Sequence, residues 1–180
     1  MKLERNRIWY DLQYVVLNQI VCKIPCWSVR RYFYRRYGVQ MGKDSRIGIG
    51  TVIICPQNIR IGARTVVNED CVLDGRGGLA IGHDTSISMS CKVLSASHDM
   101  HSPNFAYHTH RTVIGSNVWM GTSAIVLDGS RIGDFAVIGA GAVVKNTVSE
   151  QSVVIGNPAR EIKKRKLDRQ YCLDYKAYFR

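Results

Sequence analysis

A six-residue repeat of aliphatic residues constrains the fold of this chain most strongly. The uninterrupted part of the series is Ile114, Met120, Val126, Ile132, Ile138 and Val144, and earlier members are Ile47, Ile53, Ile61, Val67, Leu73, Ile81, Ile87 and Val93. A period of six fits neither a helix nor an amphipathic strand. It fits a parallel β-solenoid, in which three hexapeptides form a triangular coil and stacked coils bury one aliphatic column. A sandwich of short strands, the alternative, does not predict six consecutive matches.

Two interruptions of the repeat are informative. The step from Leu73 to Ile81 is eight residues, so the segment DGRGG is expected to bulge from a corner. The step from Val93 to Ile114 is twenty-one residues, three more than a full coil, so a loop of about residues 99–112 is expected to be expelled. Loops that leave a rigid scaffold often carry function.

The chain therefore divides into three predicted parts. Residues 1–40 form an N-terminal helical cap, residues 41–158 the solenoid domain, and residues 159–180 a basic tail that includes a short helix. The net charge of +11 is concentrated in RRYFYRR near the start and REIKKRK near the end. Such separate clusters favour local anion sites over a nucleic-acid surface, so no nucleic-acid partner is expected.

The cysteines and the N-terminus indicate a cytoplasmic protein. The six cysteines contain no CxxC pair, which suits a reducing compartment. Polar residues interrupt the apolar N-terminus, so neither a signal peptide nor a membrane span is expected. The basic aromatic segment CWSVRRYFYRRYG has two interpretations: it caps the open end of the solenoid, or it also contacts an anionic membrane at its inner face.

Several motifs extend the repeat into a recognisable pattern. They are IGHDTSIS, the SHD before the loop, TVIGSNVWMGTSAIVLDGSRIGDFAVIGAGAVVKN and the closing VVIGNPAREIKK. Together they resemble the hexapeptide-repeat acyltransferases, the left-handed β-helix family, and especially the branch of galactoside, maltose and capsular polysaccharide O-acetyltransferases. This resemblance implies an all-β left-handed parallel β-helix and homotrimers that bind acetyl-CoA in clefts between subunits.

The resemblance also implies roles for individual residues. His98 matches the catalytic histidine, Asn68 an asparagine that binds acceptor hydroxyls, and Trp119 the tryptophan of the VWIG motif. The expected acetyl-CoA contacts are Gly121, Thr122, Ala140, Lys145, Arg160 and Lys163. Two departures matter. A family lysine falls on Asn146, and the acceptor-side aspartate of the disaccharide enzymes has no clear match, so the acceptor's identity does not transfer.

Acetyl transfer from a thioester to a hydroxyl needs a base, and histidine titrates near neutral pH. His98 is the predicted base, and backbone amides that follow Trp119 are predicted to stabilise the oxyanion, because Gly121 allows close approach. The remaining loop histidines, His101, His108 and His110, are interpreted as solvated. A zinc site in this cluster is an alternative, but the zinc-binding relatives spread their histidines over successive coils, so no metal is expected.

The predicted function is transfer of acetyl from acetyl-CoA to a hydroxyl of a carbohydrate, including a lipid-linked one, in capsule, exopolysaccharide or O-antigen assembly. Two alternatives stay open. One is an antibiotic (xenobiotic) O-acetyltransferase, and the other is a trimeric scaffold or zinc-binding module without catalytic activity.

Overall fold

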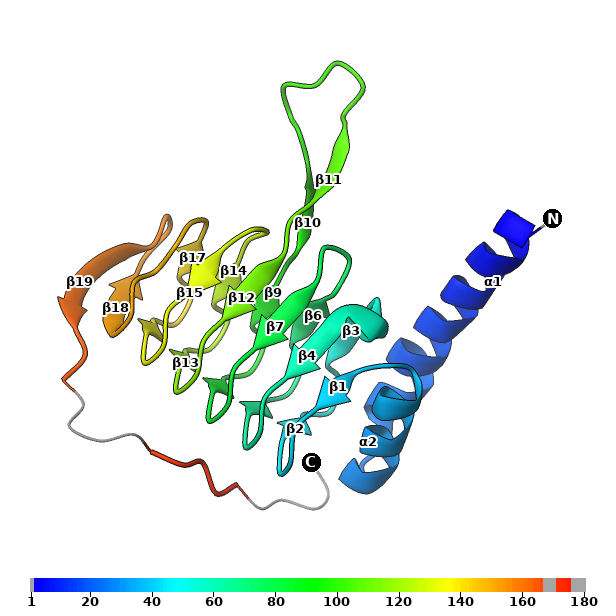
Figure 1. Ribbon diagram of the computed structural model, residues 1–180, viewed down its shortest axis with the longest axis horizontal. Coiled ribbons are helices and arrows are strands. Elements are labelled where there is room, and N and C mark those ends of the chain that lie inside the picture. The colour runs from blue at the N-terminus through cyan, green and yellow to red at the C-terminus, as the bar shows by residue number, and fades with distance from the viewer. Residues whose placement is uncertain (1, 167–170, 176–180) are drawn as a thin grey trace.

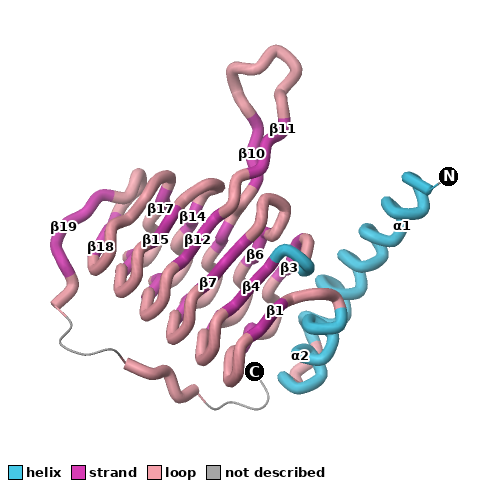
Figure 2. Tube along the Cα trace, viewed as in Figure 1, coloured by secondary structure: helices cyan, strands magenta, loops and turns pink. Residues whose placement is uncertain are grey.

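The computed structural model describes residues 2–166 and 171–175, with the side chains described from residue 8 onward, as a parallel β-solenoid with three sheets (Figures 1 and 2). The first sheet contains β1 (Gln40–Met41), β4 (Ile59–Ile61), β7 (Leu79–Ile81), β12 (Thr112–Ile114) and β15 (Arg131–Ile132). The second contains β2 (Arg46–Ile47), β5 (Val66–Val67), β8 (Ser86–Ile87), β13 (Trp119–Met120), β16 (Val137–Ile138), β18 (Ser152–Ile155) and β19 (Arg160–Lys164). The third contains β3 (Val52–Ile54), β6 (Val72–Asp74), β9 (Lys92–Val93), β14 (Ile125–Val126) and β17 (Val143–Val144).

The aliphatic column predicted from the repeat forms the core. Its members point inward from the three sheets and are almost completely buried, as Ile47, Ile87, Met120 and Ile138 illustrate with no exposed surface. Successive coils pair in parallel register, so that equivalent aliphatic residues stack upon one another. The solenoid predicted from the six-residue period is therefore confirmed.

The early coils are longer than three hexapeptides. Met41 pairs with Ile61 and Ile61 with Ile81, so each of these coils takes twenty residues. The predicted bulge after Leu73 accounts for the two extra residues of the second coil. The first coil has its own insertion, the short 3₁₀-helix η3 (Pro56–Asn58), which accounts for the eight-residue step from Ile53 to Ile61 in the aliphatic series.

Glycines at the corners allow the coils to approach closely. A Cβ atom on Gly62 would lie 2.5 Å from the carbonyl carbon of Gly82, and one on Gly82 would lie 2.6 Å from that of Gly115. Both neighbours are backbone atoms that cannot rotate away. The glycines that follow the aliphatic positions are thus required by the stacking distance between coils.

Replacing Gly62 with alanine is expected to destabilise the protein by about 1–3 kcal/mol, because the added methyl group forces two coils apart. Urea denaturation measures the change. Lys92→Ala, on the exposed side of β9, is the control and should change stability by less than about 0.5 kcal/mol. Equal stability of Gly62→Ala and the wild type would contradict this account of the corner glycines.

The N-terminal segment covers the open end of the first coil. It comprises α1 (Lys2–Val15), the π-helical turn η1 (Val16–Ile20), the 3₁₀ turn η2 (Val21–Lys23) and α2 (Trp27–Arg36). The Asn18 side chain donates to the carbonyl of Ile53 at 2.9 Å and accepts from its amide at 2.8 Å, as a neighbouring strand would. The buried Arg30 donates to the carbonyl of Ile47 at 3.2 Å. Polar side chains of the cap therefore form hydrogen bonds with backbone groups at the unpaired edge of the first coil.

The expelled segment is an ordered hairpin rather than an irregular loop, and it projects from the solenoid (Figure 1). Strands β10 (Ala96–His98) and β11 (Tyr107–Thr109) pair antiparallel, and the chain re-enters the first sheet at Thr112. The excursion therefore begins at Ala96, earlier than the expected residue 99. The reason is that residues before and after the loop can pair with each other once the chain leaves the coil.

The expected C-terminal helix is not formed in the described part of the tail. Residues Arg160–Lys164 form β19, antiparallel to β18, and residues 171–175 are extended. The remainder of that prediction, residues 167–170 and 176–180, lies outside the described residues. Backbone groups of the tail are held by polar side chains of the coils: Asn117 donates to the carbonyl of Tyr171 at 2.7 Å, and Asp84 accepts from the amide of Leu173 at 2.9 Å.

Asp84 explains why the tail is held there. Burial raises the pKa of this carboxyl, but the ion pair with Arg64 and the hydrogen bond from Leu173 outweigh that effect and lower the pKa to about 2. The carboxylate is consequently charged at neutral pH, and it accepts from the side chain and the backbone groups that surround it.

Candidate active site

His98 lies in β10, and its ring is fixed by the tip of the hairpin. Its Nδ1 atom is 2.9 Å from the carbonyl oxygen of Phe105, and its ring stacks on the Phe105 ring with centroids 4.2 Å apart. A carbonyl oxygen only accepts hydrogen bonds, so Nδ1 carries the proton and donates. The neutral ring then presents an unprotonated Nε2 atom. This tautomer is the one that a general base requires.

Trp119 and Asn68 lie at a different corner, where the second sheet turns into the third. The Trp119 side chain on β13 is half exposed, and its Nε1 donates to Ser88 Oγ at 3.4 Å. Ser88 follows β8 as Asn68 follows β5, so the two polar residues occupy equivalent positions on adjacent coils. The Asn68 amide nitrogen donates to the carbonyl of Ile87 at 2.8 Å.

On later coils, small residues occupy the same corner. A Cβ atom on Gly121 would lie 2.6 Å from the amide nitrogen of Ala140, and the Thr122 carbonyl accepts from the amide of Gly141 at 2.9 Å. The side chains of Thr122 and Ala140 are both exposed. The three predicted cofactor contacts therefore stack beside Trp119 on one edge, which remains open because its side chains are small.

Two of the backbone amides that follow Trp119 are not free to stabilise an oxyanion. The amide of Gly121 donates to the carbonyl of Ile138 at 2.7 Å, and the amide of Ser123 donates to Met89. Both groups are used in stacking the coils. The amide of Thr122 lies between them and has no hydrogen-bond acceptor among the described residues. It is therefore the amide of this segment that is free to donate a hydrogen bond.

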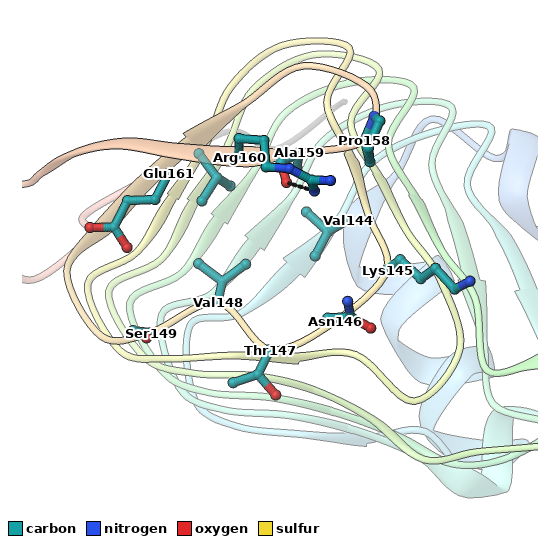
Figure 3. Close-up of a pocket in the computed structure, with 11 residues that line it drawn as sticks. Val144, Lys145, Asn146, Thr147, Val148, Ser149, Pro158, Ala159, Arg160 and Glu161 are labelled. Atoms are coloured by element: carbon teal, nitrogen blue, oxygen red, sulfur yellow. Dashed lines mark hydrogen bonds between the residues drawn. The ribbon is translucent and has the colours of Figure 1, made fainter.

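The basic residues of the last coil surround a pocket of about 340 Å³ (Figure 3). Lys145 and Arg160 both line it, and Figure 3 shows the Arg160 side chain lying across the pocket. Asn146, which stands where the family has a lysine, also lines it. Lys163 does not line it, because it lies farther along β19, where it pairs with Val153. The structure thus brings two of the three predicted cations together.

One chain does not bring the predicted base and the predicted acceptor contact together. The hairpin with His98 leaves the solenoid between β9 of the third sheet and β12 of the first. Asn68 and Trp119 lie where the second sheet meets the third. Two separate corners of the triangular coil therefore carry the two halves of the candidate site.

Comparison with known proteins finds relatives of similar sequence and fold. The family model described as bacterial transferase hexapeptide (six repeats) matches residues 111–146. The colanic acid biosynthesis acetyltransferase WcaF of Escherichia coli K12 is 29% identical over 159 residues, which cover 88% of this chain and 86% of WcaF.

Two solved structures have the same fold over nearly the whole chain. A maltose O-acetyltransferase from Clostridium difficile 630 superposes with a TM-score of 0.81 at 26% identity and covers 92% of this chain and 89% of its own. The hexapeptide-repeat acetyltransferase VCA0836 of Vibrio cholerae, complexed with acetyl coenzyme A, gives 0.78 at 26% identity, covering 92% and 90%. The chain thus shares the repeat motif and the fold of the hexapeptide-repeat acyltransferases. The resemblance stated from the sequence motifs is thereby confirmed.

In this acyltransferase the loop histidines do not behave alike. His101 lies exposed near the tip of the hairpin. His110 Nδ1 instead lies 2.9 Å from Asp128 Oδ2, and His108 Nδ1 lies 3.6 Å from the same oxygen. Burial raises the pKa of Asp128, but hydrogen bonds from His110 and Ser97 outweigh this effect and lower it. His108 and His110 therefore have a specific partner that the interpretation as solvated residues missed.

Asp128 was missed because it lies in the next coil, eighteen residues after His110. A signal was nevertheless present in the repeat. Val126 pairs with Val93, so Asp128 stands one coil above Ser95, next to the point at which the hairpin leaves. Extending the predicted register across the loop would have placed the Asp128 carboxylate next to the base of the hairpin.

Proposed function

We propose that this acyltransferase transfers an acetyl group from acetyl-CoA to a hydroxyl of a carbohydrate during capsule, exopolysaccharide or O-antigen assembly. The observation that carries the proposal is the fixed tautomer of His98, which presents Nε2 as a base on a projecting hairpin. The similarity to WcaF, named for colanic acid biosynthesis, supports a polysaccharide acceptor. The VCA0836 complex supports acetyl-CoA as the donor.

The proposed reaction follows from the position of the proton on the His98 ring. His98 Nε2 removes the proton of the acceptor hydroxyl as its oxygen attacks the thioester carbonyl carbon. The tetrahedral intermediate carries a negative oxygen, for which the amide of Thr122 is the proposed donor. Collapse of the intermediate breaks the carbon–sulfur bond, and the proton on Nε2 passes to the leaving thiolate. The products are the acetyl ester and free CoA.

The acetyl-CoA contacts are proposed along the corner that carries Trp119. Gly121, Thr122 and Ala140 leave space for the extended pantetheine arm beside the coils. Lys145 and Arg160 at the last coil provide positive charge for the phosphates of CoA, and Arg presents a planar fork suited to them. Lys163 remains a proposal as a more distant phosphate contact.

A homotrimer is proposed because it would unite the two corners. In a threefold assembly of parallel solenoids, the corner of one subunit that carries the hairpin faces the corner of its neighbour that carries Asn68 and Trp119. Each of the three boundaries would then hold one complete site, with the base from one subunit and the acceptor contact from the next.

An acceptor screen tests the proposed reaction. The purified full chain is incubated with acetyl-CoA and with nucleotide sugars, free sugars or lipid-linked oligosaccharides, and thiol release and the acetylated product are measured. Acceptor-dependent thiol release with a carbohydrate supports the proposal. Turnover with a hydroxylated antibiotic but no carbohydrate would instead support the xenobiotic enzyme, and turnover with no hydroxyl acceptor would support a scaffold.

We also propose that the protein works in the cytoplasm, peripherally at the inner face of the membrane. In the part of the chain that the structure describes, no helix is long and apolar enough to cross a bilayer. Helix α1 nevertheless exposes Ile8, Trp9 and Leu12, each by more than half. Arg31 and Arg35 of α2 line a shallow surface with Tyr32 nearby. Apolar and aromatic side chains next to arginines are typical of helices that bind anionic membrane surfaces.

The double variant Trp9→Ser, Leu12→Ser is expected to bind anionic vesicles about tenfold less tightly or worse, because two large apolar side chains no longer enter the interface. Co-sedimentation with phosphatidylglycerol-containing vesicles measures binding. Met89→Ser, which removes an exposed apolar side chain from the solenoid, is the matched control and should bind as the wild type does. Wild-type protein that stays in the supernatant would refute the proposed contact.

A further inference from the structure

His108, His110 and Asp128 converge at the base of the hairpin (labelled β10 and β11 in Figure 1). One ligand atom from each residue lies within 4.8 Å of the others. Among the side chains that the structure describes, in residues 8–166 and 171–175, they are the one group of at least three His, Cys, Asp or Glu close enough to hold a metal ion. We propose that they form a binding site for a divalent transition ion of the zinc type.

The distances fit the geometry of such an ion. Ligand bonds of about 2.0–2.2 Å in tetrahedral coordination place neighbouring donor atoms roughly 3.3–3.6 Å apart. The Nδ1 atom of His110 is 2.9 Å, and that of His108 3.6 Å, from Asp128 Oδ2. The first separation is shorter than this range, the second is at its upper end, and all three donor atoms lie within 4.8 Å of one another, so side-chain rotations complete the site.

The chemistry of the donors selects the class of ion. Two imidazole nitrogens and one carboxylate oxygen suit Zn²⁺ and its neighbours in the first transition series, whereas Mg²⁺ and Ca²⁺ prefer oxygen ligands alone. Three protein ligands leave a fourth coordination position open to water or another small ligand. Ser97 Oγ, 3.3 Å from the Nε2 atom of His108, provides a second contact that orients this ring.

The solenoid holds the cluster in place. A Cβ atom on Gly129, the residue after Asp128, would lie 3.2 Å from the Cβ of His110, and the backbone at Gly129 has a positive φ of 73°. A Cβ atom on Gly77 would lie 2.8 Å from the His110 amide nitrogen. The His110 backbone is therefore packed between two coils, one of which also supplies Asp128. The donor atoms meet because the scaffold positions them, not because a mobile loop brings them together.

This proposal departs from the sequence-based expectation that the chain has no metal. That expectation rested on the histidines lying within a single loop, whereas the structure adds a carboxylate from the following coil. A bound ion would also join the hairpin to the coil next to it. It would thereby fix the element that carries His98, whose neighbour Ser97 pairs with His108.

Metal titration of the full, untagged chain tests the proposal. The protein is stripped with EDTA, dialysed, and titrated with Co²⁺ by visible absorption and with Zn²⁺ by calorimetry, in the absence of acetyl-CoA. We expect one ion per chain, with the intense visible bands of low-coordinate Co²⁺. His110→Gln and Asp128→Asn should each weaken binding about 100-fold or more, because each removes a direct ligand.

His101→Gln is the matched control, since His101 is on the same hairpin but outside the cluster, and it should bind metal as the wild type does. Circular dichroism confirms that each variant is folded. The proposal is overturned if the wild type binds no ion in excess metal, if His110→Gln and Asp128→Asn bind as the wild type does, or if His101→Gln weakens binding equally. Since no acceptor or acetyl-CoA is present, failure here is distinct from failure of the proposed acetyl transfer.

Discussion

His98→Ala is expected to reduce kcat for acetyl transfer about 10²- to 10⁴-fold, because the acceptor hydroxyl loses the group that removes its proton. The proposed role of this residue rests on the contact of its Nδ1 atom with the carbonyl of Phe105, which leaves Nε2 free. The KM for acetyl-CoA should change little, because the cofactor contacts are proposed along a different corner. Initial rates of thiol release at saturating acceptor measure the effect.

His101→Ala is the control for this experiment, because it removes an exposed imidazole from the same hairpin. It should retain nearly all activity, and both variants should have the assembly state of the wild type. If His98→Ala kept more than about a tenth of the wild-type rate, the general base would have to be another group. His110, which is paired with the carboxylate of Asp128, would be the next residue to test.

The core could be predicted from the sequence because it depends on local periodicity. Each buried aliphatic residue from Ile114 to Val144 fills the same position in successive faces, so a repeat in the sequence becomes a column in space. The insertion in the first coil is present in the same series as the eight-residue step from Ile53 to Ile61, but the step alone does not indicate the 3₁₀-helix that fills it. Ile59, six residues after Ile53, begins β4 and pairs with Leu79, so it does not occupy the position equivalent to Ile53.

Contacts between distant segments were predicted less well. The β19 strand was not predicted, because it forms by pairing of Arg160–Lys164 with β18, a contact that the local sequence does not indicate. At the candidate active site, the resemblance proposed His98 and Trp119, but only the hydrogen bonds between coils show which amides remain free. Asp128 became recognisable only after the hairpin had been placed above its coil.

The separation of His98 and Asn68 leads to the second large effect. Asn68→Ala alone is expected to lower activity about 10- to 100-fold, because the acceptor loses a hydrogen bond in the transition state. Trimers of Asn68→Ala and trimers of His98→Ala should thus both be nearly inactive. If each site takes His98 from one subunit and Asn68 from the next, however, a boundary between the two variants can contain both wild-type side chains.

Mixed trimers of the two variants, purified through two different tags after joint refolding in equal amounts, should recover about one third of wild-type activity. This fraction follows because a ring that contains both variants has, among its three boundaries, one at which an Asn68→Ala subunit supplies His98 and a His98→Ala subunit supplies Asn68. Mixed trimers of Asn68→Ala and wild type are the control and should have about one half of wild-type activity. A boundary between two of their subunits is active whenever a wild-type subunit supplies Asn68. Verified mixed trimers no more active than either parent would show that both residues act within one chain, and the arrangement across the boundary would be wrong.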